Sequence, residues 1–172
     1  MKTFQFIAVL VLLPIFVFAQ NKITKEIETQ PGGKLNLELT TGGDIEVFIP
    51  SGTPINIEGD GSVPMELFCE GRQVRIFLDP HTLGPLTATF VIVQAERRVG
   101  EVTSVDESYR TLTVDGESVF VQLGATILDT RGPVDTLVGF EEIDVNDQLE
   151  YFGLNACPGD MGFTAFVILI TG

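Results

Sequence analysis

The chain has 172 residues, of which 44% are hydrophobic, and 24 Asp and Glu against 10 Lys and Arg give it a formal net charge of −14 at pH 7. This balance opposes binding to nucleic acids and to anionic lipids, because affinity for phosphate comes mainly from Lys and Arg. The 18 glycines, many of them in turn dipeptides, separate short alternating runs and predict an all-β protein.

The first segment, Met1–Ala19, has the features of a signal peptide. Lys2 forms a positive n-region, Phe6–Phe18 is an apolar h-region, and the small residue Ala19 predicts cleavage before Gln20. The apolar run is too short to span a hydrocarbon core of about 30 Å. We therefore expect an exported protein, located in the periplasm, at the cell surface or outside the cell, with no transmembrane segment after signal cleavage.

An N-terminal β-domain with Gly-rich turns is expected over residues 20–96. Lys22–Thr29 alternates weakly and predicts an edge strand, and cleaner alternation follows in Lys34–Thr40 and in Ile45–Ile49. Turn signals recur about every ten residues, which is compatible with a β-sandwich, a meander or a short β-solenoid. The charged run Glu96–Arg98 is the predicted connection to the second half.

Part of this domain resembles a known class of exported protein. The stretch Gly33–Gly59, which begins GKLNLELTTGGDIEV, is similar to the opening of bacterial adhesin-like β-domains of unknown function. The resemblance implies a strand, a Gly-Gly-Asp turn and a second strand, in domains that usually continue as a β-solenoid.

The C-terminal domain, residues 98–172, is organised around Leu112–Leu123. Asp115 and Gly116 lie there between two alternating apolar runs, and both residue types tolerate the positive φ of a type I′ hairpin turn. Five strands are predicted at Val99–Val105, Arg110–Val114, Ser118–Leu123, Gln148–Leu154 and Phe163–Thr171. Between the third and fourth, Thr126–Pro133 is interpreted as a connection and Leu137–Ile143 as a short helix or turn.

This order of elements, three strands, a short helix and two strands, is that of the OB-type five-stranded barrel. Residues 98–171, with the runs GEVTSVD, TLTVDG, VFVQL and FEEIDVNDQLEYFGL, resemble a bacterial exported domain family of unknown function with an OB-like barrel. The resemblance implies the barrel and brings no catalytic residues. OB barrels often bind oligonucleotides or sugars on the face of strands two and three, which would carry Tyr109, Arg110 and Phe120 here. An aromatic and basic stacking platform is not visible there, and we expect Phe120 and Tyr151 to lie in the barrel core instead.

The cysteines, Cys69 and Cys157, allow two interpretations. An exported protein meets an oxidising compartment, so they can form a disulfide that ties the two halves together. They can also be two separate buried thiols that behave as small hydrophobic residues.

Few residues are candidates for chemistry. His81 is the only histidine, and a transition-metal site needs three or four N or S ligands, so we interpret His81 as a solvated loop residue. Asp144 and Asp147, in an acidic turn, are candidate calcium ligands, although Asp is also a common turn former. No catalytic residue and no cofactor are predicted.

We therefore expect a non-catalytic secreted or envelope-associated binding or structural module, with a protein or glycan partner at the cell envelope. The alternative is a carbohydrate- or small-ligand-binding accessory module, or a small hydrolase with a carboxylate site. A cleft with two converging carboxylates would favour the hydrolase. An exposed apolar strand edge or patch would favour association with a partner.

Overall fold

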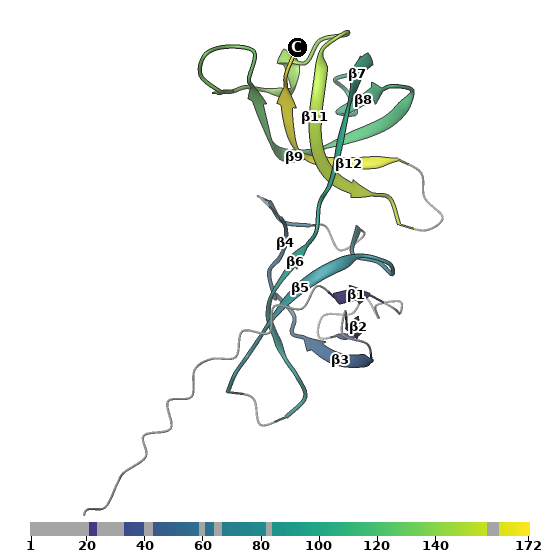
Figure 1. Cartoon of the computed structure of the whole chain (residues 1–172), viewed down its shortest axis with the longest axis vertical. Helices are drawn as coiled ribbons and strands as arrows, with labels where there is room; N and C mark the ends of the chain where they lie inside the picture. Colours follow the sequence, from purple (N-terminus) through teal and green to yellow (C-terminus); the bar gives the residue numbers. More distant parts are fainter. Residues whose placement is uncertain are drawn as a thin grey trace, which may run out of the picture.

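The computed structural model describes residues 21–23, 33–39, 43–58, 61–63, 67–81, 84–157 and 162–172. The predicted signal peptide, Met1–Ala19, lies outside these residues. The described chain forms two six-stranded sheets, one from each half of the sequence (Figure 1). Within this described part, no helix is both long enough and apolar enough to cross a membrane.

The N-terminal half forms one mixed sheet with the strand order β3-β2-β1-β5-β6-β4. Its strands are β1 (Asn21–Ile23), β2 (Gly33–Leu39), β3 (Asp44–Ile49), β4 (Ile55–Ile57), β5 (Gln73–Leu78) and β6 (Ala88–Val93). β1 pairs with β2 on one side and with β5 on the other, so the prediction of an edge strand after Lys22 is wrong. The predicted extension of that strand, residues 24–29, lies outside the described residues.

This sheet curls so that β3, the strand at one of its edges, reaches β6 and the residues just before it. Phe48 in β3 forms a bridge with Thr87, and the Phe48 N–H donates a hydrogen bond to the Leu86 carbonyl at 2.7 Å. Further along the chain, β4 pairs in parallel with β6. The curl encloses a core in which the inward side chains of alternating positions, such as Leu37, Val47 and Val74, are almost completely buried.

The C-terminal half forms the predicted OB-like barrel. Its strands are β7 (Glu96–Asp106), β8 (Thr111–Val114), β9 (Glu117–Asp129), β10 (Thr136–Leu137), β11 (Gln148–Asn155) and β12 (Phe163–Ile170). The order is β10-β9-β12-β11-β7-β8, and β8 pairs again with β9, which closes five strands into a ring. β9 and β12 are parallel, whereas the other neighbours in the ring are antiparallel.

The central hairpin has the predicted turn. Asp115 and Gly116 have φ values of 48° and 83°, and Val114 pairs with Glu117 across them. Positive φ at both central residues defines a type I′ turn, whose twist matches that of the two strands. Asp115 also exchanges hydrogen bonds with Glu101 of β7, which fixes the hairpin against the first strand of the barrel.

Other predicted boundaries differ from the structure. Glu96–Arg98, predicted as a connection, is the start of β7 and pairs with β11. Thr126–Pro133 was predicted to be a connection throughout, but β9 continues to Asp129, because Ile127 returns to the barrel core after an interruption at Gly124. The predicted short helix or turn is a 3₁₀ helix, Phe140–Glu142, with Phe140 buried.

The two halves share part of one core. Among the residues that the structure describes, the barrel core contains only barrel residues, such as Val102, Leu112 and Ile168. The core of the curled sheet, in contrast, includes Leu154 of β11 and Phe166 of β12, which are 0% and 3% exposed. These two side chains point out of the barrel and pack into the sheet.

Candidate functional site

A break in the pairing of β9 with β12 creates a hollow between the two halves. Ala165 pairs with Val121 and Val167 pairs with Thr126, so the four residues of β9 from 122 to 125 oppose Phe166 alone. Phe166 is also skipped in the pairing with β11, where Phe152 and Gly153 pair with Val167 and Ala165. The extra residues form a wide bulge in β9, in which Gly124 adopts a φ of 85° that favours glycine.

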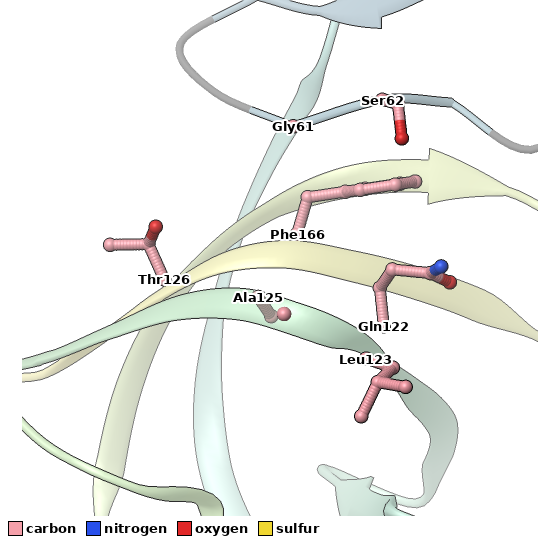
Figure 2. Close-up of a pocket in the computed structure, with 8 residues that line it drawn as sticks. Gly61, Ser62, Gln122, Leu123, Ala125, Thr126 and Phe166 are labelled. Atoms are coloured by element: carbon pink, nitrogen blue, oxygen red, sulfur yellow. The ribbon is translucent and has the colours of Figure 1, made fainter.

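The space at this bulge, which we call the bulge pocket, has a volume of about 220 Å³. Its lining residues are Gly61, Ser62, Gln122, Leu123, Gly124, Ala125, Thr126 and Phe166. Figure 2 shows Phe166 in the middle of the pocket, with Ser62 of the curled sheet on one side and Gln122 and Thr126 of the barrel on the other. The pocket therefore belongs to both halves of the molecule and depends on how they are joined.

The described lining is neutral. Ser62 and Thr126 provide hydroxyl groups, Gln122 provides an amide, and Phe166 provides an aromatic ring whose edge lies 3.8 Å from the position that a Cβ on Gly61 would occupy. These groups can hydrogen-bond an uncharged polar ligand and contact its apolar surface.

The outer face of β8 and β9 continues from this pocket. Phe120 lies two residues before Gln122 on the same face, about 7 Å along the strand, and pairs with Thr111 on one side and Thr164 on the other. Val119 and Val121 point inward, so Phe120 points outward and is 44% exposed. The prediction that Phe120 belongs to the barrel core is therefore wrong, whereas Tyr151, at 3% exposure, does lie in the core.

Two further apolar side chains are exposed near this face. Tyr109 is 74% exposed and Leu123 is 79% exposed. The Val121 N–H donates to the Arg110 carbonyl at 2.8 Å, which keeps the turn containing Tyr109 beside β9. Arg110 itself turns away from the face and stacks on the Phe140 ring, with its guanidinium carbon 4.9 Å from the ring centre.

The candidate calcium ligands have other roles in the structure. Asp147 is buried, and its Oδ1 accepts a hydrogen bond from Arg131 at 2.9 Å, while its Oδ2 accepts one from the Asp144 N–H at 2.8 Å. The Asp144 side chain is exposed. Among the residues that the structure describes, no three His, Cys, Asp or Glu side chains gather in a group that could hold a metal ion. His81 lies on an exposed turn, where its N–H donates to Asp79.

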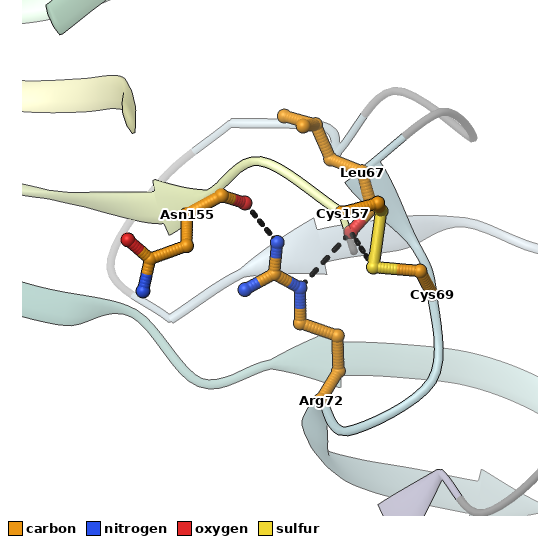
Figure 3. The surroundings of a disulfide bond; sticks show 5 residues. All are labelled: Leu67, Cys69, Arg72, Asn155 and Cys157. Carbon is orange, nitrogen blue, oxygen red and sulfur yellow. Dashed lines mark hydrogen bonds between the residues drawn. A yellow bond between two sulfur atoms is a disulfide. The ribbon is translucent and has the colours of Figure 1, made fainter. Parts of the chain in front are cut away.

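Cys69 and Cys157 form a disulfide in the structure, with 5.9 Å between their Cα atoms (Figure 3). It links the curled sheet to the segment after β11, and Arg72 reinforces this link. The Arg72 guanidinium donates to the Leu67 carbonyl at 3.1 Å and to the Asn155 carbonyl of the barrel. Burial lowers the pKa of Arg72, and the nearby Glu96 carboxylate partly offsets this effect.

A polar network continues from Asn155 at the end of β11 to charged residues at the start of β7 and of β9. The Asn155 side chain donates to Glu96 and accepts from Arg98 at 2.6 Å. Arg98 also pairs with Glu117 and stacks on the Phe163 ring, 4.4 Å from its centre. The hydrogen bond to Glu117 raises the pKa of Arg98, so Arg98 stays charged in this network. A second hollow of about 310 Å³ borders Arg72 and Glu96, whose charges this network already engages.

The pocket residues were not predicted from the sequence. One local signal was present, since Gly124 interrupts the alternating pattern of β9, and glycine inside a strand often marks a bulge. Ser62 and Phe166 could not have been assigned to the pocket in this way, because their meeting depends on the packing of the two halves. Comparison of the chain with protein-family models, with curated proteins and with solved structures gives no match.

Proposed function

We propose that this protein is an exported, non-catalytic binding module, and that it binds its partner at the bulge pocket and the adjoining face of β8 and β9. The observation that carries the proposal is the wide bulge of β9, which opens a neutral pocket at the line where the two halves meet. Bulges are common next to functional sites, where they redirect side chains or end strand pairing.

The exposed side chains beside the pocket support a binding role. Phe120, Leu123 and Tyr109 present apolar surface on one side of a barrel whose core is otherwise well filled. Exposed apolar groups that cluster beside a pocket are typical of interaction sites. The described lining offers hydroxyl, amide and ring contacts, which suit binding, whereas a carboxylate-based hydrolase would need two converging carboxylates at one cleft.

Export is supported by two independent features. Met1–Ala19 has the charge, length and cleavage pattern of a signal peptide. The Cys69–Cys157 disulfide fits an oxidising compartment outside the cytoplasm.

The test blocks the pocket and measures retention on the cell surface. Purified mature protein is mixed with isolated envelopes of the producing organism, and the bound fraction is measured after sedimentation over a range of protein concentrations. Ser62→Trp places a large ring at the pocket and is expected to abolish saturable retention. Ser51→Trp, on the exposed turn between β3 and β4, is the matched control and is expected to bind like the unmodified protein.

Thermal melts of both variants show whether the fold is intact. If Ser62→Trp melts normally and still binds as tightly as Ser51→Trp, the pocket is not the binding site and the proposal fails.

A further inference from the structure

We infer that the partner at the bulge pocket is a neutral glycan, with one sugar unit in the pocket and the next unit over the Phe120 ring. This inference rests on the proposed function and assigns a ligand class to the same site. Three features of the described residues support it: the size and chemistry of the pocket, the hydroxyl-rich face beside it, and the distribution of charge.

The pocket fits a single small unit rather than a large ligand. Its volume of about 220 Å³ lies below the roughly 300–1,000 Å³ of sites for drug-sized molecules. A pyranose ring carries hydroxyl groups around its edge and apolar C–H groups on its faces. Ser62, Gln122 and Thr126 match the edge, and the exposed edge of the Phe166 ring offers apolar contact at the floor of the pocket (Figure 2).

The face beside the pocket continues the same chemistry. Phe120 is flanked by the hydroxyl residues Thr111 and Thr164 on its two neighbouring strands. The next pair along the hairpin, Thr113 with Ser118, repeats the pattern with two more hydroxyl residues. An exposed ring set among hydroxyl groups can stack on one sugar while its neighbours bond to the sugar edges, so the face can follow a chain of at least two units.

Charge favours a neutral glycan over an acidic one. The whole chain has a net charge of −14, which repels uronic acids and sulfated or phosphorylated sugars. Two arginines of the barrel that lie close in sequence to this face, Arg98 and Arg110, interact with other groups of the protein. Arg98 pairs with Glu117, and Arg110 stacks on Phe140. The described pocket lining also has no carboxylate to attract a cationic peptide.

The first experiment separates glycan from protein on the envelope. Envelopes are treated with periodate, which cleaves vicinal diols of sugars, or with protease, and retention of the unmodified protein is then measured. Periodate is expected to abolish saturable retention, and protease is expected to leave it. Retention that survives periodate and is lost after protease would overturn the glycan inference and leave the proposed binding function intact.

The second experiment tests neutrality by competition. Glycans released from the envelopes are separated on an anion exchanger into neutral and acidic fractions, and each fraction is added as a competitor. The neutral fraction is expected to displace the protein. Displacement by the acidic fraction alone, or by neither fraction, would overturn the inference.

The third experiment tests the position of the sugar chain. Phe120→Ala is expected to weaken half-maximal binding at least about tenfold, whereas Leu137→Ala, which removes an even more exposed apolar side chain from β10, is expected to leave it unchanged. Unchanged binding by Phe120→Ala, together with loss of binding by Ser62→Trp, would show that the chain does not cross Phe120. Equal binding by all variants would remove the proposed function itself.

Discussion

The two halves of the molecule bury their apolar side chains in different ways. The barrel closes on itself, and the described side chains of its core all belong to the barrel. The curled sheet leaves part of its core open, and Leu154 and Phe166 of the barrel fill that part. We therefore expect the sheet to depend on the barrel for its stability, since no described residue of the sheet enters the barrel core.

The largest expected effect comes from removing the covalent link between the halves. Cys69 and Cys157 are 88 residues apart in sequence, and in the chain-entropy model a disulfide closing a loop of this length contributes about 4–5 kcal/mol. The double substitution of both cysteines by Ser is therefore expected to lower the free energy of unfolding by up to about that amount, measured by urea denaturation. Hydrogen exchange should show the greater loss of protection in the sheet.

Mass spectrometry of the purified protein provides the control. Reduction should add two hydrogens, and the oxidised protein should resist alkylation. Two alkylatable thiols before reduction would contradict the disulfide.

A somewhat smaller effect is expected when the shared core is truncated. Phe166→Ala removes a ring that is 3% exposed, and such substitutions in cores cost about 3–5 kcal/mol. Although Phe166 belongs to a barrel strand, the amides of β5 and β6 should lose more protection from hydrogen exchange than those of β8. Leu123→Ala, at 79% exposure, is the control and should change the free energy of unfolding by no more than about 0.5 kcal/mol. Equal loss of protection in both halves would contradict the dependence of the sheet on the barrel.

Substitutions in the hairpin turn change residues that lie only in the barrel. Replacing Asp115 and Gly116 by Ala places Ala at positive φ and removes the hydrogen bond to the Glu101 N–H, which together should cost about 2–3 kcal/mol in the free energy of unfolding. Because the sheet core relies on barrel strands, both halves should lose stability in one transition. Gly132→Ala, where φ is not positive and a Cβ would make only an ordinary contact with the Val134 carbonyl oxygen at 3.7 Å, is the matched control. A normal melting temperature for the double variant would show that the turn is unimportant.

The smallest effect concerns acid stability. The hydrogen bond with Arg97 holds the pKa of Glu150 below its ordinary value. A lowered pKa in the folded state means that the ion pair stabilises the protein above the ordinary Glu pKa of about 4.3 and that this contribution is lost as the pH falls through the lower, folded-state value. Glu150→Gln should therefore reduce stability slightly at neutral pH and show a shallower decline on acidification, measured by urea denaturation at several pH values. An unaltered pH profile would show that the exposed pair has no net effect.

The sequence pattern was sufficient to predict the barrel and insufficient to predict the site. Alternation and the Asp115-Gly116 turn predicted the five strands, because each strand has one face in the core and the turn fixes the register. In Phe163–Ile170 every residue except Thr164 is apolar. The pattern therefore does not distinguish side chains that point into the barrel from those that point out, and it could not show that Phe166 leaves the barrel. The same ambiguity placed Phe120 in the core, and the pocket followed from pairings between distant strands that no local pattern encodes.

The position of Phe166 near the end of the chain has a consequence for how the protein is made. Synthesis produces the N-terminal sheet first, but Leu154, Cys157 and Phe166 follow only with β11, β12 and the segment between them. Long-range pairings of this kind form slowly, and domains that wait for them stay incomplete. The N-terminal half therefore lacks part of its core until the residues of β11 and β12 have been made. Folding of the two halves then becomes one event, completed when β12 pairs with β9 and β11.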